Sequence, residues 1–147
     1  SDDIQLLVRL HPNMSCDYKI SPEFACDVTK YPDMQELLAA VDILITDYSG
    51  CCMDMMIASK PVILLLKDKD NYLSKERGVY FKIDELPFTK AYTDDELIEI
   101  ILRDEYSDNV KKVNEFKEYV GLFEDGRASK RVKKILVDVM EGNYEKI

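Results

Sequence analysis

The chain has 147 residues, 46% of them hydrophobic, and a formal net charge of -9 at pH 7. This length suits one globular domain with a continuous core and is too short for two. The acidic balance excludes a general electrostatic attraction to nucleic acid or anionic lipid, so we expect no nucleic-acid partner, and polyanion binding would need a local basic pocket.

The cysteines show neither the paired spacing of a zinc site nor the density of a disulfide scaffold. They are Cys16, Cys26, Cys51 and Cys52. We therefore predict reduced thiols, a cytoplasmic location and no metal site. The longest apolar stretches, 39–46 and 61–66, are far shorter than the ~20 residues of a membrane-spanning helix. The N-terminus lacks a secretory pattern, and its abrupt apolar start suggests a domain excised from a longer protein.

The first half alternates short apolar runs with helical patterns, which is typical of βαβ units around a buried parallel sheet. The run 61–66 begins with a proline, which is permitted at a strand start, and its continuous apolarity indicates a central strand. A short helix over 72–77 and an extended piece over 78–81 should follow. The expected fold class is α/β, a Rossmann-like parallel sheet flanked by helices in one domain over 1–147. The expected strands are 4–10, 25–28, 41–46 and 61–66, and the expected helices are 34–40 and 51–59.

The last third is helical in pattern. Thr93 and Glu96 have the spacing of a capping box ahead of an apolar helical face. Two further helices are predicted over 108–120 and 128–140, stopping near Gly121 and Gly142. The last helix carries a basic cluster, which would approach a membrane surface or close over a neighbouring domain, and the acidic overall charge favours the second interpretation. The cluster consists of Lys130, Arg131, Lys133 and Lys134.

A phosphate-binding turn is predicted at residues 46–50, between an expected strand and an expected helix. In open parallel sheets, ligands bind at the carboxyl ends of strands and phosphates settle on helix N-termini. Thr46 and Ser49 supply hydroxyl groups, and Gly50 permits close approach of the backbone. This inventory fits a pyrophosphate. The alternative is that Ser49 is an ordinary helix N-cap and Asp47 a turn residue.

Two cationic side chains end the first expected strand. Arg9 and His11 are two residues apart, so they point to the same side of a strand that should reach the same sheet edge. There they could contact a diphosphate and assist its departure. His11 is the only histidine in the chain. Arg77, which precedes a glycine, is a further phosphate-contact candidate, with a local salt-bridged turn as the alternative.

Six short blocks, taken in order, resemble the CDP-glycerol glycerophosphotransferases, and together they extend across nearly the whole chain. The resemblance implies the C-terminal, donor-binding half of a two-domain GT-B fold, with the acceptor half outside this chain. The blocks are Arg-Leu-His-Pro at 9–12, Tyr-Pro-Asp at 31–33, Ile-Thr-Asp-Tyr-Ser at 45–49, Lys-Pro-Val at 60–62, Glu-Arg-Gly-Val-Tyr at 76–80 and Asp-Gly-Arg-Ala-Ser at 125–129.

The resemblance also implies a reaction. Glycerol phosphate would pass from CDP-glycerol to a growing teichoic-acid-type polymer, releasing CMP without a cofactor, and this half alone would be inactive. The polymer would bind through the missing N-terminal domain. Only the full-length protein, and not this chain by itself, would contact a membrane, at the inner face of a bacterial plasma membrane. The implied roles are catalysis for His11 and Arg9, donor-phosphate binding for Thr46, Ser49, Gly50 and Arg77, and proximity to the nucleotide or glycerol for Asp47, Asp125 and Gly126.

Two positions depart from the family pattern. The family usually has two adjacent serines where this chain has Ser49-Gly50, and often a glycine where this chain has Ser59. Two alternatives stay open. One is a GT-B transferase domain for another nucleotide-activated polyol or sugar. The other is a non-catalytic receiver-like module with Asp47 as acceptor, which predicts an acidic cluster around Asp47.

Overall fold

The computed structural model of the chain describes residues 4–11, 19–69 and 81–143. The expected helix over 72–77, most of the extended piece over 78–81, and Arg77 lie outside these ranges. Contacts group the chain into two compact units, residues 1–40 and residues 41–147. The expectation of one domain over 1–147 stays a prediction.

The first unit contains a two-stranded parallel sheet and one helix. Strand β1 (Leu7–Val8) pairs with β2 (Cys26–Asp27). Both strands are shorter than expected. Beyond the carboxyl end of β1, the Leu10 amide donates to the Thr29 hydroxyl at 3.1 Å and not to a ladder carbonyl. Helix α1 (Met34–Ala40) begins where predicted, after an Asp33 carboxylate that accepts from the Glu36 amide at 3.0 Å.

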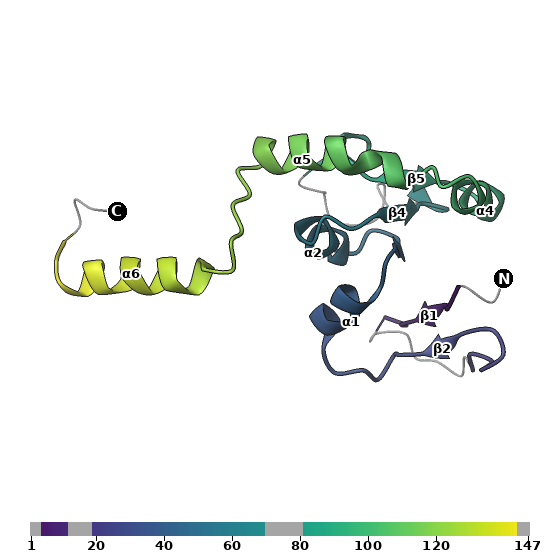
Figure 1. The fold of residues 1–147 in the computed structure, drawn as a ribbon, viewed down its shortest axis with the longest axis horizontal. Helices are drawn as coiled ribbons and strands as arrows, with labels where there is room; N and C mark the ends of the chain where they lie inside the picture. The colour runs from purple at the N-terminus through teal and green to yellow at the C-terminus, as the bar shows by residue number, and fades with distance from the viewer. Residues whose placement is uncertain (1–3, 12–18, 70–80, 144–147) are drawn as a thin grey trace. The chain divides into compact units, whose positions relative to one another are not determined.

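The second unit is built on a three-stranded parallel sheet (Figure 1). Strand β4 (Val62–Leu65) lies between β3 (Leu44–Thr46) and β5 (Thr89–Ala91), which confirms the predicted central strand. The expected α/β fold class is confirmed. The expectation that the first strand joins the same sheet is wrong, since the described strands form two separate hydrogen-bonded sheets.

Helices complete the second unit. Helix α2 (Cys51–Ile57) follows β3, and α4 (Asp94–Leu102) follows β5. Two 3-10 turns, η1 (Ile83–Glu85) and η2 (Ser107–Asn109), precede β5 and α5 (Val110–Tyr119) respectively. The core cluster contains Ile63, Ala91 and Ile100, with Leu97 and Ile101 of α4 packed against it.

The predicted start of α4 is confirmed, with one difference in its hydrogen bonds. The Thr93 hydroxyl accepts from the Glu96 amide at 3.1 Å, as an N-cap should. The Glu96 carboxylate, however, accepts from the amide of Tyr92 at 2.6 Å, one residue before the cap. The carboxylate therefore holds the chain between β5 and α4 as well as the helix end.

Left-handed backbone occurs where two predicted helices end, at Gly121 (φ 65°) and Gly142 (φ 75°). Ser59 is also left-handed (φ 55°). This is the position where the family often has glycine, and a side chain there is strained because of its Cβ. The Ser59 hydroxyl accepts from Lys117 Nζ at 2.7 Å, which offsets part of that strain.

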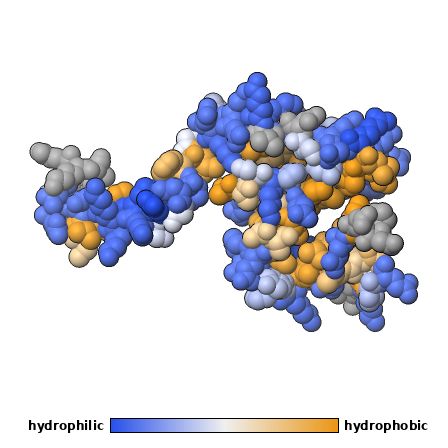
Figure 2. Space-filling model, viewed as in Figure 1, coloured by the Kyte–Doolittle hydropathy of each residue, from blue (hydrophilic) through white to orange (hydrophobic). Residues whose placement is uncertain are grey.

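Helix α6 (Ala128–Met140) matches its predicted bounds and has no buried residue. Its apolar side chains recur at spacings of three and four, so they form one face. Figure 2 shows part of this surface in orange beside the blue of charged residues. Among the described residues, no helix is long and apolar enough to span a membrane. The exposed members of the face are Val132, Ile135, Leu136, Val139 and Met140.

Candidate donor-binding site

The predicted phosphate-binding turn joins the carboxyl end of β3 to the start of α2. Ser49 and Gly50 are exposed, and Thr46 is half-buried with its hydroxyl 3.6 Å from the Cys51 thiol. The N-cap of α2 is Gly50, and no side chain caps the helix. The alternative reading of Ser49 as the N-cap is therefore wrong. No group in the described ranges hydrogen-bonds to the Ser49 hydroxyl.

Backbone amides supply most of the unpaired hydrogen-bond donors of this turn. The amides of Ser49, Gly50 and Cys51 have no acceptor among residues 4–11, 19–69 and 81–143. The first N–H groups of a helix lack intrahelical partners, and consecutive free amides form a concavity that suits an anion. Because α2 is only seven residues long, the local amides matter more than its dipole.

Side chains around the turn fix its position. The Tyr48 hydroxyl donates to the Asp68 carboxylate at 3.0 Å, which ties the turn to the loop after β4. Sequence reasoning gave Tyr48 no role, although an aromatic residue inside the motif was a usable signal. Behind the turn, Cys52 is buried, and burial raises the pKa of its thiol to about 11. Cys52 therefore packs in the core of the second unit.

Gly50 is not required by the local backbone. Its φ of -62° and ψ of -14° are ordinary helical values, and a Cβ built there would meet no atom within 4 Å. A serine, which the family usually has at this position, would therefore fit in this chain. The departure removes a hydroxyl without changing the shape of the turn.

Arg9 binds within the first unit. Its Nη1 donates to the carbonyl oxygens of Tyr31, at 2.6 Å, and Val28, at 3.5 Å. The guanidinium thereby ties the end of β1 to the segment after β2. Its Nε and Nη2 have no acceptor in the described part of the chain, so donors remain for a ligand. His11 is exposed at the end of the same segment.

Asp125 and Gly126 form the turn before α6. The Asp125 carboxylate accepts from the Arg127 amide at 2.9 Å and from the Arg131 guanidinium. The hydrogen bond from Arg131 is the main cause that lowers the pKa of Asp125. Gly126 is left-handed (φ 72°), a conformation that favours glycine. Both residues therefore have local structural roles.

The structure gathers Thr46, Asp47, Ser49 and Gly50 in one turn of the second unit, and places Arg9 and His11 together in the first. Their convergence on one ligand stays a prediction, as do the roles of Asp125 and Gly126. Asp47 is exposed. In the described ranges no three His, Cys, Asp or Glu side chains form a metal-binding group.

The chain is an α/β protein with a parallel sheet, and its exposed, amide-lined turn lies at a strand's carboxyl end, where such proteins commonly bind phosphate groups. The model of one family, CDP-Glycerol:Poly(glycerophosphate) glycerophosphotransferase, matches residues 1–138. The chain belongs to this family.

Curated relatives act in teichoic acid synthesis. The chain is 34% identical over 134 residues to the teichoic acid poly(ribitol-phosphate) polymerase of Bacillus spizizenii, covering 89% of this chain and 21% of that protein. It is 30% identical to the teichoic acid glycerol-phosphate primase of Bacillus subtilis, covering 89% and 34% respectively. The chain thus spans about a fifth to a third of the length of these relatives.

Solved structures agree with this assignment. The wall teichoic acid polymerase TagF superposes with a TM-score of 0.73 and 26% identity, over 97% of this chain and 36% of TagF. A TagF variant soaked with CDPG gives a TM-score of 0.74 at 25% identity, again over 97% of this chain and 36% of the variant. The match supports the predicted placement in one part of a GT-B transferase.

Proposed function

We propose that this chain is the donor-binding half of a CDP-glycerol:poly(glycerophosphate) glycerophosphotransferase and holds the donor diphosphate at residues 46–50. The observation that carries the proposal is the row of free amides at Ser49, Gly50 and Cys51 beside an exposed Ser49 hydroxyl. Such donors suit phosphate oxygens, and the family to which the chain belongs is named for transfer of glycerophosphate.

The cationic residues complete the proposed site. Asp47 is exposed within the turn, and Asp54 lies in the first turn of α2. A diphosphate there would need positive charge from elsewhere. Arg9 retains free guanidinium donors, so we assign charge neutralisation to Arg9 and His11, assisted by Arg77. We further propose that Asp125 and Gly126 lie near the nucleotide or the glycerol of the bound donor.

The chemistry that follows is phosphoryl transfer. The terminal hydroxyl of the acceptor attacks the glycerol-bearing β-phosphorus of CDP-glycerol and gives up its proton to a base. The bond to the bridging oxygen breaks, and CMP leaves with that electron pair. Positioning and neutralisation of charge carry most of the catalysis in such reactions. The base and the acceptor polymer site belong to the remainder of a longer protein, peripheral at the cytoplasmic face of the membrane.

A second donor, CDP-ribitol, is favoured by one observation. The relative with 34% identity is named a poly(ribitol-phosphate) polymerase, while others are named for glycerol phosphate. Both donors share the CDP group, so the turn at 46–50 would serve either one. The polyol would be distinguished by contacts beyond the diphosphate.

Calorimetry with the 147-residue chain tests the site. We expect CDP-glycerol or CDP-ribitol to bind, and Ser49→Ala to weaken binding about tenfold, because a hydrogen bond to a charged group is worth roughly 1.5–3 kcal/mol. Ser107→Ala, an exposed serine of η2 outside the six family blocks, is the matched control and should bind as the parent does. No binding at millimolar donor, or undiminished binding by a His11→Ala/Ser49→Ala double variant, would contradict the assignment.

A variant that should bind the donor more tightly provides a second test of the site. Gly50→Ser fits the open space at that position and restores the hydroxyl that the family usually has. We expect tighter donor binding with an unchanged circular dichroism spectrum. Weaker binding would mean that the donor approaches the Gly50 backbone too closely for a side chain.

A further inference from the structure

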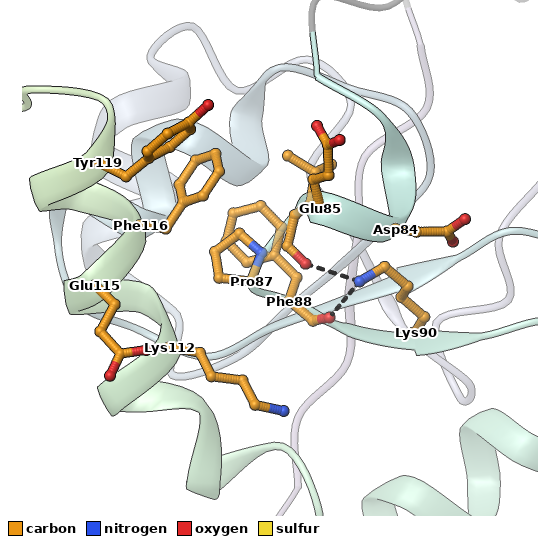
Figure 3. A pocket seen from close by; sticks show the side chains of 10 residues that line it. Asp84, Glu85, Pro87, Phe88, Lys90, Lys112, Glu115, Phe116 and Tyr119 are labelled. Carbon is orange, nitrogen blue, oxygen red and sulfur yellow. Dashed lines mark hydrogen bonds between the residues drawn. The ribbon is translucent and has the colours of Figure 1, made fainter.

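A cavity of about 470 Å³ lies in the second unit, away from the turn at 46–50. One wall is the segment from η1 to β5, and the other is one face of α5 (Figure 3). Phe88, Phe116 and Tyr119 supply aromatic surface, and Lys90 and Lys112 supply charge. The volume is within the range of small-molecule sites.

The cavity is at the amino end of the sheet. Phe88 immediately precedes β5, whereas the turn at 46–50 follows β3, and the strands are parallel. Helix α5 is tied to this end twice. The Asn109 side chain donates to the Thr89 hydroxyl, and Lys117 donates to the hydroxyl of Ser59, which precedes β4. The cavity therefore lies at the amino ends of the strands, and the proposed donor turn lies at their carboxyl ends.

The acidic side chains of the cavity are already paired with lysines that do not line it. Asp84 accepts from Lys69 at 2.8 Å, and this hydrogen bond is the main cause that lowers the pKa of Asp84. The carboxylates of Glu85 and Glu115 are 3.9 Å and 3.8 Å from the ammonium groups of Lys82 and Lys111. The negative charge of the lining is thus largely compensated from outside the cavity.

Neither of the two lining lysines forms an ion pair with a described residue. Lys90 is half-buried and donates to the carbonyl oxygens of Leu86, at 2.8 Å, and Phe88, at 3.2 Å, which leaves one of its three N–H donors (Figure 3). Desolvation is the main cause that lowers the pKa of Lys90; the charge of Asp84 opposes this shift, and the charge of Lys112 acts in the same direction as desolvation. Within the described ranges Lys112 has no hydrogen bond or ion pair. An anion would suit both groups.

The aromatic side chains that line the cavity would suit a ligand with a planar ring. Phe116 is buried and packs edge-on against Phe81, with ring centroids 5.2 Å apart. Tyr119, with its centroid 6.1 Å from that of Phe116, is 77% exposed although it borders the cavity. A planar ligand ring placed there would cover apolar surface of Tyr119 and face the edge or face of Phe116.

We propose that this cavity binds a small organic anion in which a planar ring is joined to one carboxylate or phosphate group. The ring packs against Phe116 and Tyr119, and the anionic group accepts from Lys90 and Lys112. An inorganic anion would leave the aromatic wall uncovered, and a neutral ring would leave both lysines without an ion-pair partner. The site is separate from the proposed donor site, and its ligand requires neither cytidine nor a polyol.

Amide chemical-shift titration of the 147-residue chain tests this proposal. The probes are phenyl phosphate and benzoate, with inorganic phosphate and benzyl alcohol as the two half-ligands. We expect saturable shifts at residues 84–90 and 112–119 with at least one complete probe, and about tenfold weaker binding of each half-ligand. The tighter of the two complete probes identifies the preferred acid.

Two exposed variants keep the test independent of folding. Lys112→Gln and Tyr119→Ser should each weaken the complete probe about tenfold, while Lys133→Gln on α6, the same change of charge outside the cavity, should leave binding unaltered. The proposal is overturned if neither complete probe shifts these residues, if inorganic phosphate binds as tightly as phenyl phosphate, or if Lys112→Gln binds as the parent does.

Discussion

Strand β4 and helix α6 are both rich in apolar residues, but their surroundings differ completely. In β4, Val62, Ile63 and Leu64 are all buried, between two neighbouring strands. In α6 no residue is buried, and Leu136 and Met140 are 57% and 86% exposed. The difference shows that an apolar pattern specifies the type of element, while burial also requires partners that the pattern does not name.

The largest expected effect comes from the same substitution in both elements. Ile63→Ala removes a fully buried side chain from the centre of the sheet and should lower the free energy of unfolding by about 3–4 kcal/mol. Ile135→Ala removes a side chain that is 45% exposed and should change it by less than about 0.5 kcal/mol. Urea unfolding followed by circular dichroism measures both. Equal losses would mean that α6 is packed in solution.

A helix cap gives the next comparison. Thr93→Ala removes the hydroxyl that accepts from the Glu96 amide at the start of α4, and should cost about 1 kcal/mol of unfolding free energy. The matched change Ser129→Ala, in the first turn of α6, removes no capping hydrogen bond and should be near neutral. If both variants unfold like the parent, the Thr93 cap contributes nothing to stability.

Strain at the entry to β4 should give a smaller effect of opposite sign. Ser59→Gly relieves the left-handed backbone but loses the hydrogen bond from Lys117, so we expect a net gain of about 0.5 kcal/mol. Lys117→Met removes the same hydrogen bond without relieving strain and should be slightly destabilising. Destabilisation by Ser59→Gly would show that the hydrogen bond outweighs the strain.

The smallest expected effect is local to the start of α6. The pKa of Asp125 is lowered by the Arg131 hydrogen bond, so the pair contributes above the ordinary aspartate value and is lost as pH falls through the lowered one. Carboxyl NMR titration should place the midpoint of Asp125 below 3.8. In Arg131→Gln it should move back up, and an unchanged midpoint would exclude Arg131 as the cause.

Much of the fold could be predicted from local pattern. The bounds of α1 and α6 and the central position of β4 were all predicted, because caps, periodicity and continuous apolarity are local signals. Strand β5 was missed because Thr89-Lys90-Ala91 is short and has a lysine at its centre. Separation into two sheets was missed because strand pairing is not a local property.

The candidate site was predictable in part for the same reason. The turn at 46–50 is one continuous stretch, so its place between strand and helix could be read from the sequence. The structural use of Arg9 could not, since its partner Tyr31 is 22 residues away in the chain. The cavity at the amino end was also missed, because its walls come from segments 84–90 and 112–119.

The free amides at Ser49, Gly50 and Cys51 have a consequence for how this turn tolerates sequence change. Every residue except proline carries an amide, so most substitutions at these positions leave the row of donors intact. A relative could therefore keep the proposed anion-binding capacity of the turn while sharing none of its side chains. Side-chain identity would then alter the strength of binding and the choice of donor, and the backbone path would preserve the capacity itself.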